Sequence, residues 1–228
     1  MKILYEDNHT IVVNKRAGEL VQPDPDGAPA LEQEVKDYLR VKYNKAGDAF
    51  LGVVHRIDRP VSGVVLFAKT SKALVRLNEQ LRERGFQKKY WAITEKRPPK
   101  EADELVHYIV RNAKTNKSTA HANPTKDGQQ AVLRYRLMKE SDRYFLLEIE
   151  LVTGRHHQIR AQLAAIGCVI KGDLKYGAAR SNRNGGISLH SRSLSFTHPT
   201  TAERIEIIAP VPEGESIWQF FDLQAAEL

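Results

Sequence analysis

The chain has 228 residues, of which 41% are hydrophobic and 28% are charged, a composition typical of globular rather than disordered proteins. No apolar run approaches the ~20 residues that cross a bilayer, and the first residues turn acidic at Glu6 and Asp7, unlike a signal peptide. The single cysteine, Cys168, excludes an intrachain disulfide and a multi-cysteine zinc site, so we expect a cytoplasmic protein. A formal net charge of +7 favours a polyanionic partner.

The first ninety residues combine short strands with two helical patterns. A helix is expected around residues 31–39, where apolar residues recur at helical spacing. Another is expected over residues 71–84, which Thr70 or Ser71 can cap and Gly85 ends. The strands expected in this part are residues 3–5, 11–13, 51–55, 62–69 and 88–94.

The remaining residues are mostly β in character. Residues 145–151 alternate apolar and polar side chains, as a half-buried antiparallel strand does, and the turn Ser141-Asp142-Arg143 joins them to a strand at 132–138. Further expected elements are helices at 156–166 and 218–223 and strands at 187–197 and 204–209. Strands dominate without strict alternation, which predicts an α+β fold with a mixed or mainly antiparallel sheet, in a single domain over 1–228.

One segment, residues 54–63, places a carboxylate among cations. Asp58 lies between Arg56 and Arg59 in a turn that contains Pro60. Nearby guanidinium groups favour the carboxylate anion, so Asp58 can serve as a nucleophile or an electrostatic stabiliser. A surface loop with a local ion pair is the alternative interpretation.

Two more segments are candidates for binding or catalysis. Residues 153–160 put two arginines and two histidines at a strand-to-helix junction, where backbone N–H groups help to bind anions. Residues 88–94 place Tyr90 on one face of a strand, and a tyrosine can stack on a base or move a proton. The alternatives are a solvated basic helix start and a core tyrosine.

Together these segments resemble the RluA-type RNA pseudouridine synthase family. The string HRIDRPVSG at 55–63 is similar to the family's HR[LI]DxxTSG, GRHHQIR at 154–160 to GRTHQIR, and AAIGCVIKGD at 164–173 to AAIGHPIxGD. The late family element is matched at 189–199, and the opening strands also fit. The departures from the pattern are Arg16, Val61, His156, Cys168 and Val169.

The resemblance implies a long, bent, mainly antiparallel sheet with flanking helices and an RNA-binding cleft. It implies cleavage of a uridine N-glycosidic bond, rotation of the uracil and reattachment through C5, with no cofactor and no metal. By the same matching, Asp58 is the nucleophile, Tyr90 stacks on the target base and can abstract a proton, and Arg160 pairs with the catalytic aspartate. Arg56 occupies the space of the flipped-out nucleotide.

The expected substrate contacts are divided between the base and the phosphates. Ile187 or Leu189 would form an apolar wall beside the base, and His55 and Arg155 of the motifs are also expected to contact substrate. Phosphate contacts are assigned to basic residues that lie outside the motifs: Lys88, Arg111, Lys114 and Lys117.

The partner is expected to be structured RNA, either transfer RNA, which we slightly favour, or large-subunit ribosomal RNA. We expect a monomer without an N-terminal S4 RNA-binding module, because the synthase motifs begin at once. One alternative is a catalytically silent RNA-binding protein on the same fold, and another is an RNA chaperone for which modification is secondary. A metal-dependent hydrolase using His55, Asp58, His156 and His157 is disfavoured, because adjacent histidines would point to different sides of a helix.

Overall fold

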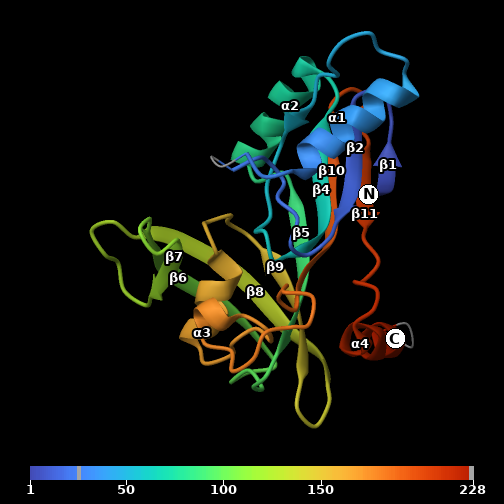
Figure 1. Cartoon of the computed structure of the whole chain (residues 1–228). Coiled ribbons are helices and arrows are strands. Elements are labelled where there is room, and N and C mark those ends of the chain that lie inside the picture. Colours follow the sequence, from blue (N-terminus) through green and yellow to red (C-terminus); the bar gives the residue numbers. More distant parts are fainter. Residues whose placement is uncertain (25–26, 226–228) are drawn as a thin grey trace. The chain divides into compact units, whose positions relative to one another are not determined.

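The computed structural model of the protein describes residues 1–24 and 27–225, and the chain divides into two compact units (Figure 1). Unit 1 contains residues 1–87 and 191–210, and unit 2 contains residues 88–190 and 211–228. Residues 25 and 26, in the loop rich in proline, aspartate and glycine over 23–29 that the sequence predicts, lie outside the described residues. The assignment of 1–228 to one catalytic domain stays a prediction.

Unit 1 is built on a buried central strand. Its strands are β1 (Lys2–Glu6), β2 (Thr10–Lys15), β3 (Gly52–Val53), β4 (Ser62–Ala68), most of β10 (Leu189–Thr197) and β11 (Arg204–Ile208). They are ordered β1-β2-β4-β10, with β3 also paired to β4 and β11 to β10. Every residue of β4 is buried, which explains its nearly continuous apolar sequence.

Two helices cover this part of the chain, where helical spacing predicted them. They are α1 (Leu31–Lys42) and α2 (Ser71–Arg82). The hydroxyl of Thr70 accepts a hydrogen bond from the backbone N–H of Ala73, which confirms the predicted cap. α2 ends before the expected residue 84, because Arg84 has a positive φ of 58° and Gly85 N donates back to Gln80 O at 2.8 Å.

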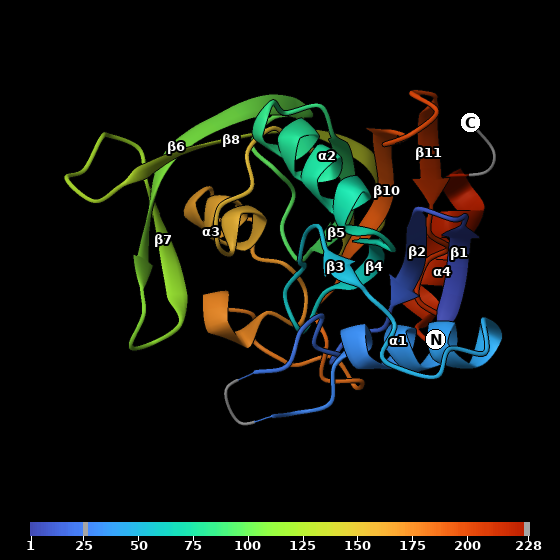
Figure 2. The ribbon, with the colours of Figure 1, turned by 90° about the horizontal axis from the view of Figure 1, so that it is seen from above.

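Unit 2 is an antiparallel sheet with a projecting hairpin. Its strands are β5 (Gln87–Thr94), β6 (Ala102–Asn112), β7 (Lys117–His121), β8 (Gln129–Glu140) and β9 (Phe145–Leu151). Their order is β5-β9-β8-β6-β7, and each of these pairs is antiparallel. The helices are α3 (Gln158–Ala165), a 3₁₀ turn η1 (Leu174–Tyr176) and α4 (Ser216–Ala225). Figure 2 shows α3 beside the β6–β7 hairpin.

Each unit has its own apolar cluster. In unit 1, side chains of β2, β4 and β10 pack with Leu77 of α2. In unit 2, Trp91 of β5 and Leu146 of β9 pack with Trp218 and Phe221 of α4. Burial of one such side chain contributes roughly 1.5–3 kcal/mol. The α+β prediction with a mainly antiparallel sheet is confirmed, and the turn at Ser141 forms as expected, with its N–H donating to Tyr144 O at 2.8 Å.

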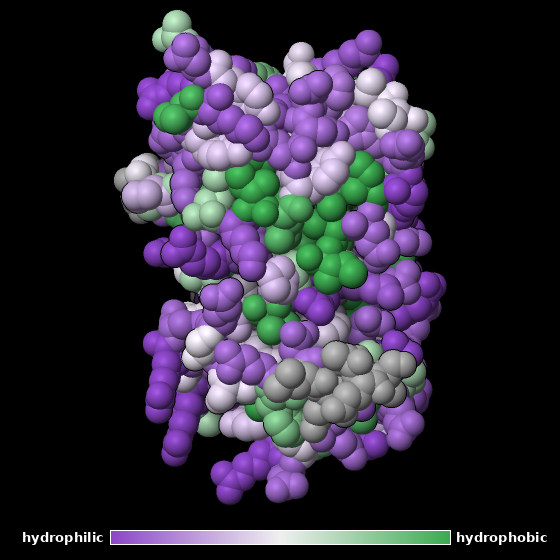
Figure 3. Space-filling model, turned by 90° about the vertical axis from the view of Figure 1, so that its right-hand side faces the viewer, coloured by the Kyte–Doolittle hydropathy of each residue, from purple (hydrophilic) through white to green (hydrophobic). Residues whose placement is uncertain are grey.

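One face of the molecule shows how polar and apolar side chains are distributed on the surface. On the face drawn in Figure 3, hydrophilic side chains predominate around apolar ones that are exposed near its middle. Among the described residues, no helix is both long enough and apolar enough to cross a bilayer.

Candidate active site

The segment that carries Asp58 is a tight turn in unit 1. Val61 N donates to Asp58 O at 3.0 Å, which closes the turn just before β4 begins. The Asp58 side chain is half-buried, and Arg56 is exposed. The loop after β2 holds the turn, because Gly18 N donates to Arg59 O at 2.8 Å and Arg59 Nε donates to Gly18 O at 3.0 Å. Asp58 is therefore presented on a turn with a fixed backbone.

A buried lysine that the sequence analysis missed completes this support. Lys15 is 1% exposed, and its ammonium donates to the carbonyl oxygens of Arg16, Glu19 and Arg59 at 2.9, 2.8 and 3.0 Å. Burial lowers the pKa of Lys15 to about 8, while the charges of Glu19 and Asp58 act in the opposite direction. In the sequence, Lys15 was only the last residue of an opening segment that fits the family, with no role assigned to it, and a lysine at a solvent-exposed strand end looks the same.

His55 supports the same segment from the other side. The strand expected at 51–55 is only two residues long, since the chain leaves the sheet after Val53 pairs with Phe67. The Nε2 atom of His55 then accepts a hydrogen bond from Leu66 N at 3.1 Å, in place of a strand carbonyl. This contact requires an Nε2 without a proton. The contact of His55 with substrate stays a prediction.

Gly63 brings two strands close together. It is the second residue of β4, within the strand expected at 62–69. Its φ is +114°, and a Cβ at this position would lie 2.2 Å from the carbonyl oxygen of Ser191 in β10. Only glycine therefore permits the backbones of β4 and β10 to approach this closely.

In unit 2, Arg160 forms a buried ion pair. Its Nε and Nη2 donate to the two carboxylate oxygens of Asp173 at 2.7 and 2.8 Å, and the two side chains are 5% and 1% exposed. The guanidinium also lies 5.0 Å from the ring centre of Tyr176. Such a bidentate pair fixes the orientation of the guanidinium plane. The pairing of Arg160 with Asp58 stays a prediction, and the bond to Asp173 was not foreseen.

The two histidines before α3 correct an expectation. The helix begins at Gln158 rather than at 156, because His157 has a left-handed backbone with φ of 53°. The rings of His156 and His157 stack, with centres 3.9 Å apart, and do not point to different sides of a helix. Burial and then the charge of Arg160 lower the pKa of His157 to about 3, so its ring is neutral at pH 7. Among the described residues, no three His, Cys, Asp or Glu side chains form a metal-ligand group.

The predicted base contacts lie on β5 and around the start of β10. Tyr90 is 6% exposed and pairs with Ile149 of β9. Lys88 is two residues earlier and half-buried, and burial lowers its pKa. Leu189 is the first residue of β10, and Ile187 precedes the strand; both side chains are buried. The N–H of Leu189 donates to the carbonyl oxygen of Ile187 at 2.8 Å.

Of the four predicted phosphate contacts, Lys88 lies on β5, and the other three gather at the tip of the β6–β7 hairpin. Arg111, Lys114 and Lys117 are exposed there, and none of them forms a salt bridge with another described residue. Arg155, at the start of the α3 segment, is also exposed, and its Nε donates to Gln130 O at 3.1 Å. These cations are therefore available to an anionic partner.

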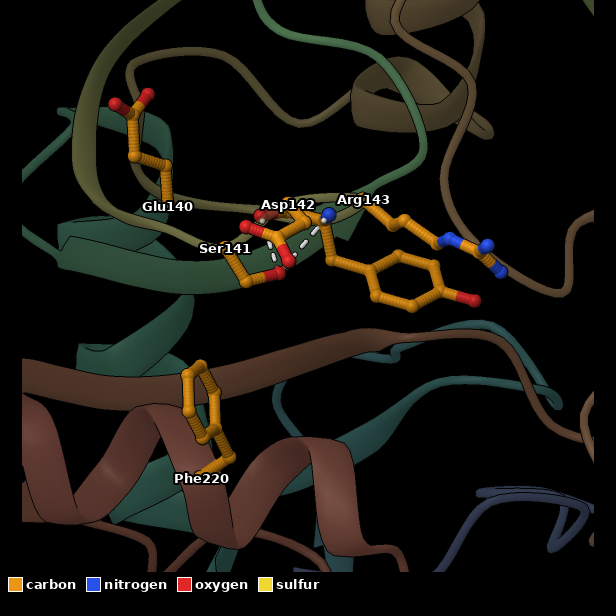
Figure 4. A pocket seen from close by; sticks show the side chains of 6 residues that line it. Glu140, Ser141, Asp142, Arg143 and Phe220 are labelled. Atoms are coloured by element: carbon orange, nitrogen blue, oxygen red, sulfur yellow. Dashed lines mark hydrogen bonds between the residues drawn. The ribbon is translucent and has the colours of Figure 1, made fainter.

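A hollow elsewhere in unit 2 is formed by the β8–β9 turn and α4. Figure 4 shows its lining residues, among them Glu140, Asp142, Arg143 and the half-exposed Phe220. None of the predicted site residues lines it, so it is not the candidate active site.

Comparison with known proteins places the chain in a family. A family model described as RNA pseudouridylate synthase matches residues 9–165. The chain belongs to the RNA pseudouridine synthases of the RluA type. The activity expected from the motifs, an isomerase that forms pseudouridine, is the activity of this family. The prediction of the enzyme class is therefore confirmed.

Curated relatives support this assignment over most of the chain. An RNA pseudouridine synthase of Bacillus subtilis is 33% identical over 214 residues, which cover 93% of this chain and 70% of that protein. The ribosomal large subunit pseudouridine synthase C of Escherichia coli is 34% identical over 220 residues, covering 93% and 67%. A Synechocystis relative is 36% identical and is covered over 66% of its length. The chain thus spans about two thirds of the length of these relatives.

Solved structures agree on the fold. Human RNA pseudouridylate synthase domain containing 4 superimposes with a TM-score of 0.80 at 23% identity, covering 98% of this chain and 93% of that one. Human RNA pseudouridylate synthase domain containing 1 gives a TM-score of 0.72 at 21% identity, covering 92% and 83%.

Proposed function

We propose that the protein isomerises specific uridines in structured RNA to pseudouridine, with Asp58 as the nucleophile. The observation that carries this proposal is the support of the Asp58 turn. The carbonyl oxygen of Arg59, the next residue, accepts hydrogen bonds from both Lys15 Nζ and Gly18 N. A catalytic carboxylate needs such fixed geometry, because small displacements of reacting groups reduce rates strongly.

The isomerisation breaks the N1–C1′ bond of uridine and forms a C5–C1′ bond, while C5 loses a proton and N1 gains one. Asp58 attacks as the carboxylate anion and is released before the product leaves, and Tyr90 is the candidate that stacks on the base and removes the C5 proton. Arg160 orients the carboxylate. The uridine must first leave its stack, which costs a few kcal/mol, and Arg56 refills the space, since a planar guanidinium can stack on neighbouring bases.

The RNA is bound through phosphates at the hairpin tip. Two cations of β8 away from the tip are paired with acidic residues of β6 and β9, in the bridges from Arg134 to Glu104 at 2.8 Å and from Arg136 to Glu148 at 3.3 Å. Within the described part of the chain, Arg111, Lys114 and Lys117 form no salt bridge, which supports their role as phosphate contacts. The Escherichia coli relative is a ribosomal large subunit pseudouridine synthase, which supports large-subunit ribosomal RNA as one substrate class, beside transfer RNA.

The direct test maps pseudouridines in total RNA from cells with and without the gene. Complementation uses wild type and Asp58→Asn, a variant that keeps the size of the side chain and removes its charge. We expect specific sites to disappear and to return only with wild type, and their positions identify the RNA.

If no pseudouridine site changes in cells, a turnover assay with purified protein tests the activity directly. Unmodified transcripts of transfer RNA and of large-subunit ribosomal RNA serve as substrates. Pseudouridine formation at a comparable rate by Asp58→Asn would contradict the assignment of the nucleophile. Binding without turnover by wild type would favour the catalytically silent RNA-binding protein.

A further inference from the structure

The tip of the β6–β7 hairpin has a defined conformation. Thr115 N donates to the side-chain oxygen of Asn112 at 3.2 Å, and Asn116 has a left-handed backbone with φ of 47°. Lys175 Nζ donates to the carbonyl oxygen of Asn116 at 3.0 Å. A loop that carries several exposed cations would otherwise sample many conformations, so these contacts restrict where its charges lie.

His156 bonds to this hairpin through both ring nitrogens. Its Nδ1 lies 2.8 Å from Ser118 Oγ, and its Nε2 lies 3.1 Å from Asn116 Oδ1. An amide oxygen only accepts, so Nε2 carries the proton and, in the neutral ring, Nδ1 accepts from the Ser118 hydroxyl. Both hydrogen bonds are satisfied by one tautomer, and both connect the start of α3 with the hairpin.

A second connection runs parallel to the first. The ring of His156 stacks on His157, whose Nδ1 lies 3.0 Å from the hydroxyl of Tyr176. That hydroxyl accepts from Ser118 N at 2.9 Å and donates to Ser118 O at 3.1 Å. Tyr176 thus holds the backbone of Ser118, and His156 holds the side chains of Ser118 and Asn116.

We propose that His156 is a positioning residue that fixes the basic hairpin tip against the start of α3. In this arrangement Arg111, Lys114 and Lys117 form a preformed surface for RNA phosphates, and the ordering cost of the tip is met before RNA binds. The role of the tip in RNA binding rests on the function proposed above. The contacts of His156 with the hairpin do not depend on it.

The experiment compares variants that remove one or both hydrogen bonds. His156→Ala removes both, His156→Asn places an amide near the Nδ1 position, and His156→Gln places one near the Nε2 position. Thr119→Ala is the matched control, since Thr119 is an exposed hydroxyl residue next to Ser118 on β7. Three quantities are measured: amide hydrogen exchange of residues 112–118 without RNA, the Kd for unmodified transfer RNA transcript against salt concentration, and kcat and KM.

We expect His156→Ala to speed exchange at the tip and to raise Kd and KM about tenfold, the loss expected for two hydrogen bonds, with kcat within about twofold of wild type. His156→Asn and His156→Gln should each recover part of the affinity, and Thr119→Ala should match wild type. Unchanged tip exchange and KM in His156→Ala would overturn the proposal.

Two other results are also decisive. A fall in Tm and kcat with unchanged tip exchange would show a general structural role and would likewise overturn it. If wild type binds RNA without forming pseudouridine, the proposed function fails, and the exchange and affinity measurements still test the role of His156.

Discussion

The Asp58 turn and the start of α3 are held in different ways. The turn is fixed through backbone groups: the carbonyl oxygen of Arg59 accepts from Lys15 and Gly18, and the N–H of Leu66 donates to His55. The start of α3 is fixed mainly by side chains bonding to one another, as in the bidentate pair of Arg160 with Asp173.

This difference determines which substitutions each region tolerates. In the turn, the contacts to backbone groups, such as those to the carbonyl oxygen of Arg59, do not depend on the side chain of the residue held. At α3, each side chain depends on the identity of its partner, so single changes leave buried polar groups unpaired.

The largest effect is expected from Gly63→Ala in β4, the strand that follows the backbone-held Asp58 turn. A Cβ would overlap the Ser191 carbonyl at 2.2 Å, and φ of +114° is unfavourable for alanine. We expect a loss of about 4 kcal/mol in the free energy of unfolding, from combined overlap and backbone strain. Urea denaturation measures this loss.

Gly18→Ala is the matched control for this prediction. Gly18 has φ of +92°, but nothing lies within 4 Å of a Cβ at that position, so only the backbone strain of about 1 kcal/mol is expected. Equal losses in the two variants would show that the close approach of β4 and β10 is not what requires glycine.

A slightly smaller effect is expected from Asp173→Asn in the side-chain-held region. The substitution leaves the buried guanidinium of Arg160 without its ion-pair partner, which costs about 3 kcal/mol in the free energy of unfolding. The double variant Arg160→Met with Asp173→Leu should be more stable than Asp173→Asn, since it removes both charges. A double variant that is less stable would show that the pair itself stabilises unit 2.

The same contrast explains what could be predicted from the sequence. Most helices and strands could be predicted, and Asp58, Tyr90 and Arg160 could be proposed as site residues, because apolar periodicity and short motifs are local signals. The strands β6 and β7 were covered only by the general expectation of β structure. The helix start at α3 was misplaced by two residues, since the left-handed backbone of His157 is set by its packing and has no glycine to indicate it.

The contacts that support the site could not be predicted in this way. Lys15 meets Arg59 across 44 positions, and the Tyr176 hydroxyl meets Ser118 across 58. No periodicity relates residues so distant in the chain. The early end of β3 could not be predicted either. In the folded chain, Leu66 N donates to the ring of His55 rather than to a backbone carbonyl oxygen, and no sequence pattern indicates this bond.

The smallest effect is expected from Lys15→Met, which tests whether the buried ammonium acts on Asp58. Because burial lowers the pKa of Lys15 to about 8, the ammonium is charged below that pH and becomes neutral above it. Wild-type kcat should therefore fall as pH rises through about 8. Lys15→Met should be about tenfold slower near pH 7, equal to ~1.4 kcal/mol of activation free energy, and should lack this alkaline fall.

The exposed Lys45→Met is the control for charge alone and should retain the wild-type profile. Turnover measured from pH 6.5 to 9.5 on the same RNA transcript separates the possibilities. If the alkaline fall persists in Lys15→Met, another group causes it, and Lys15 only supports the backbone of the turn. If the fall disappears together with the tenfold loss, the charge of the Lys15 ammonium contributes to the reaction at Asp58, in addition to the hydrogen bonds by which Lys15 supports the turn.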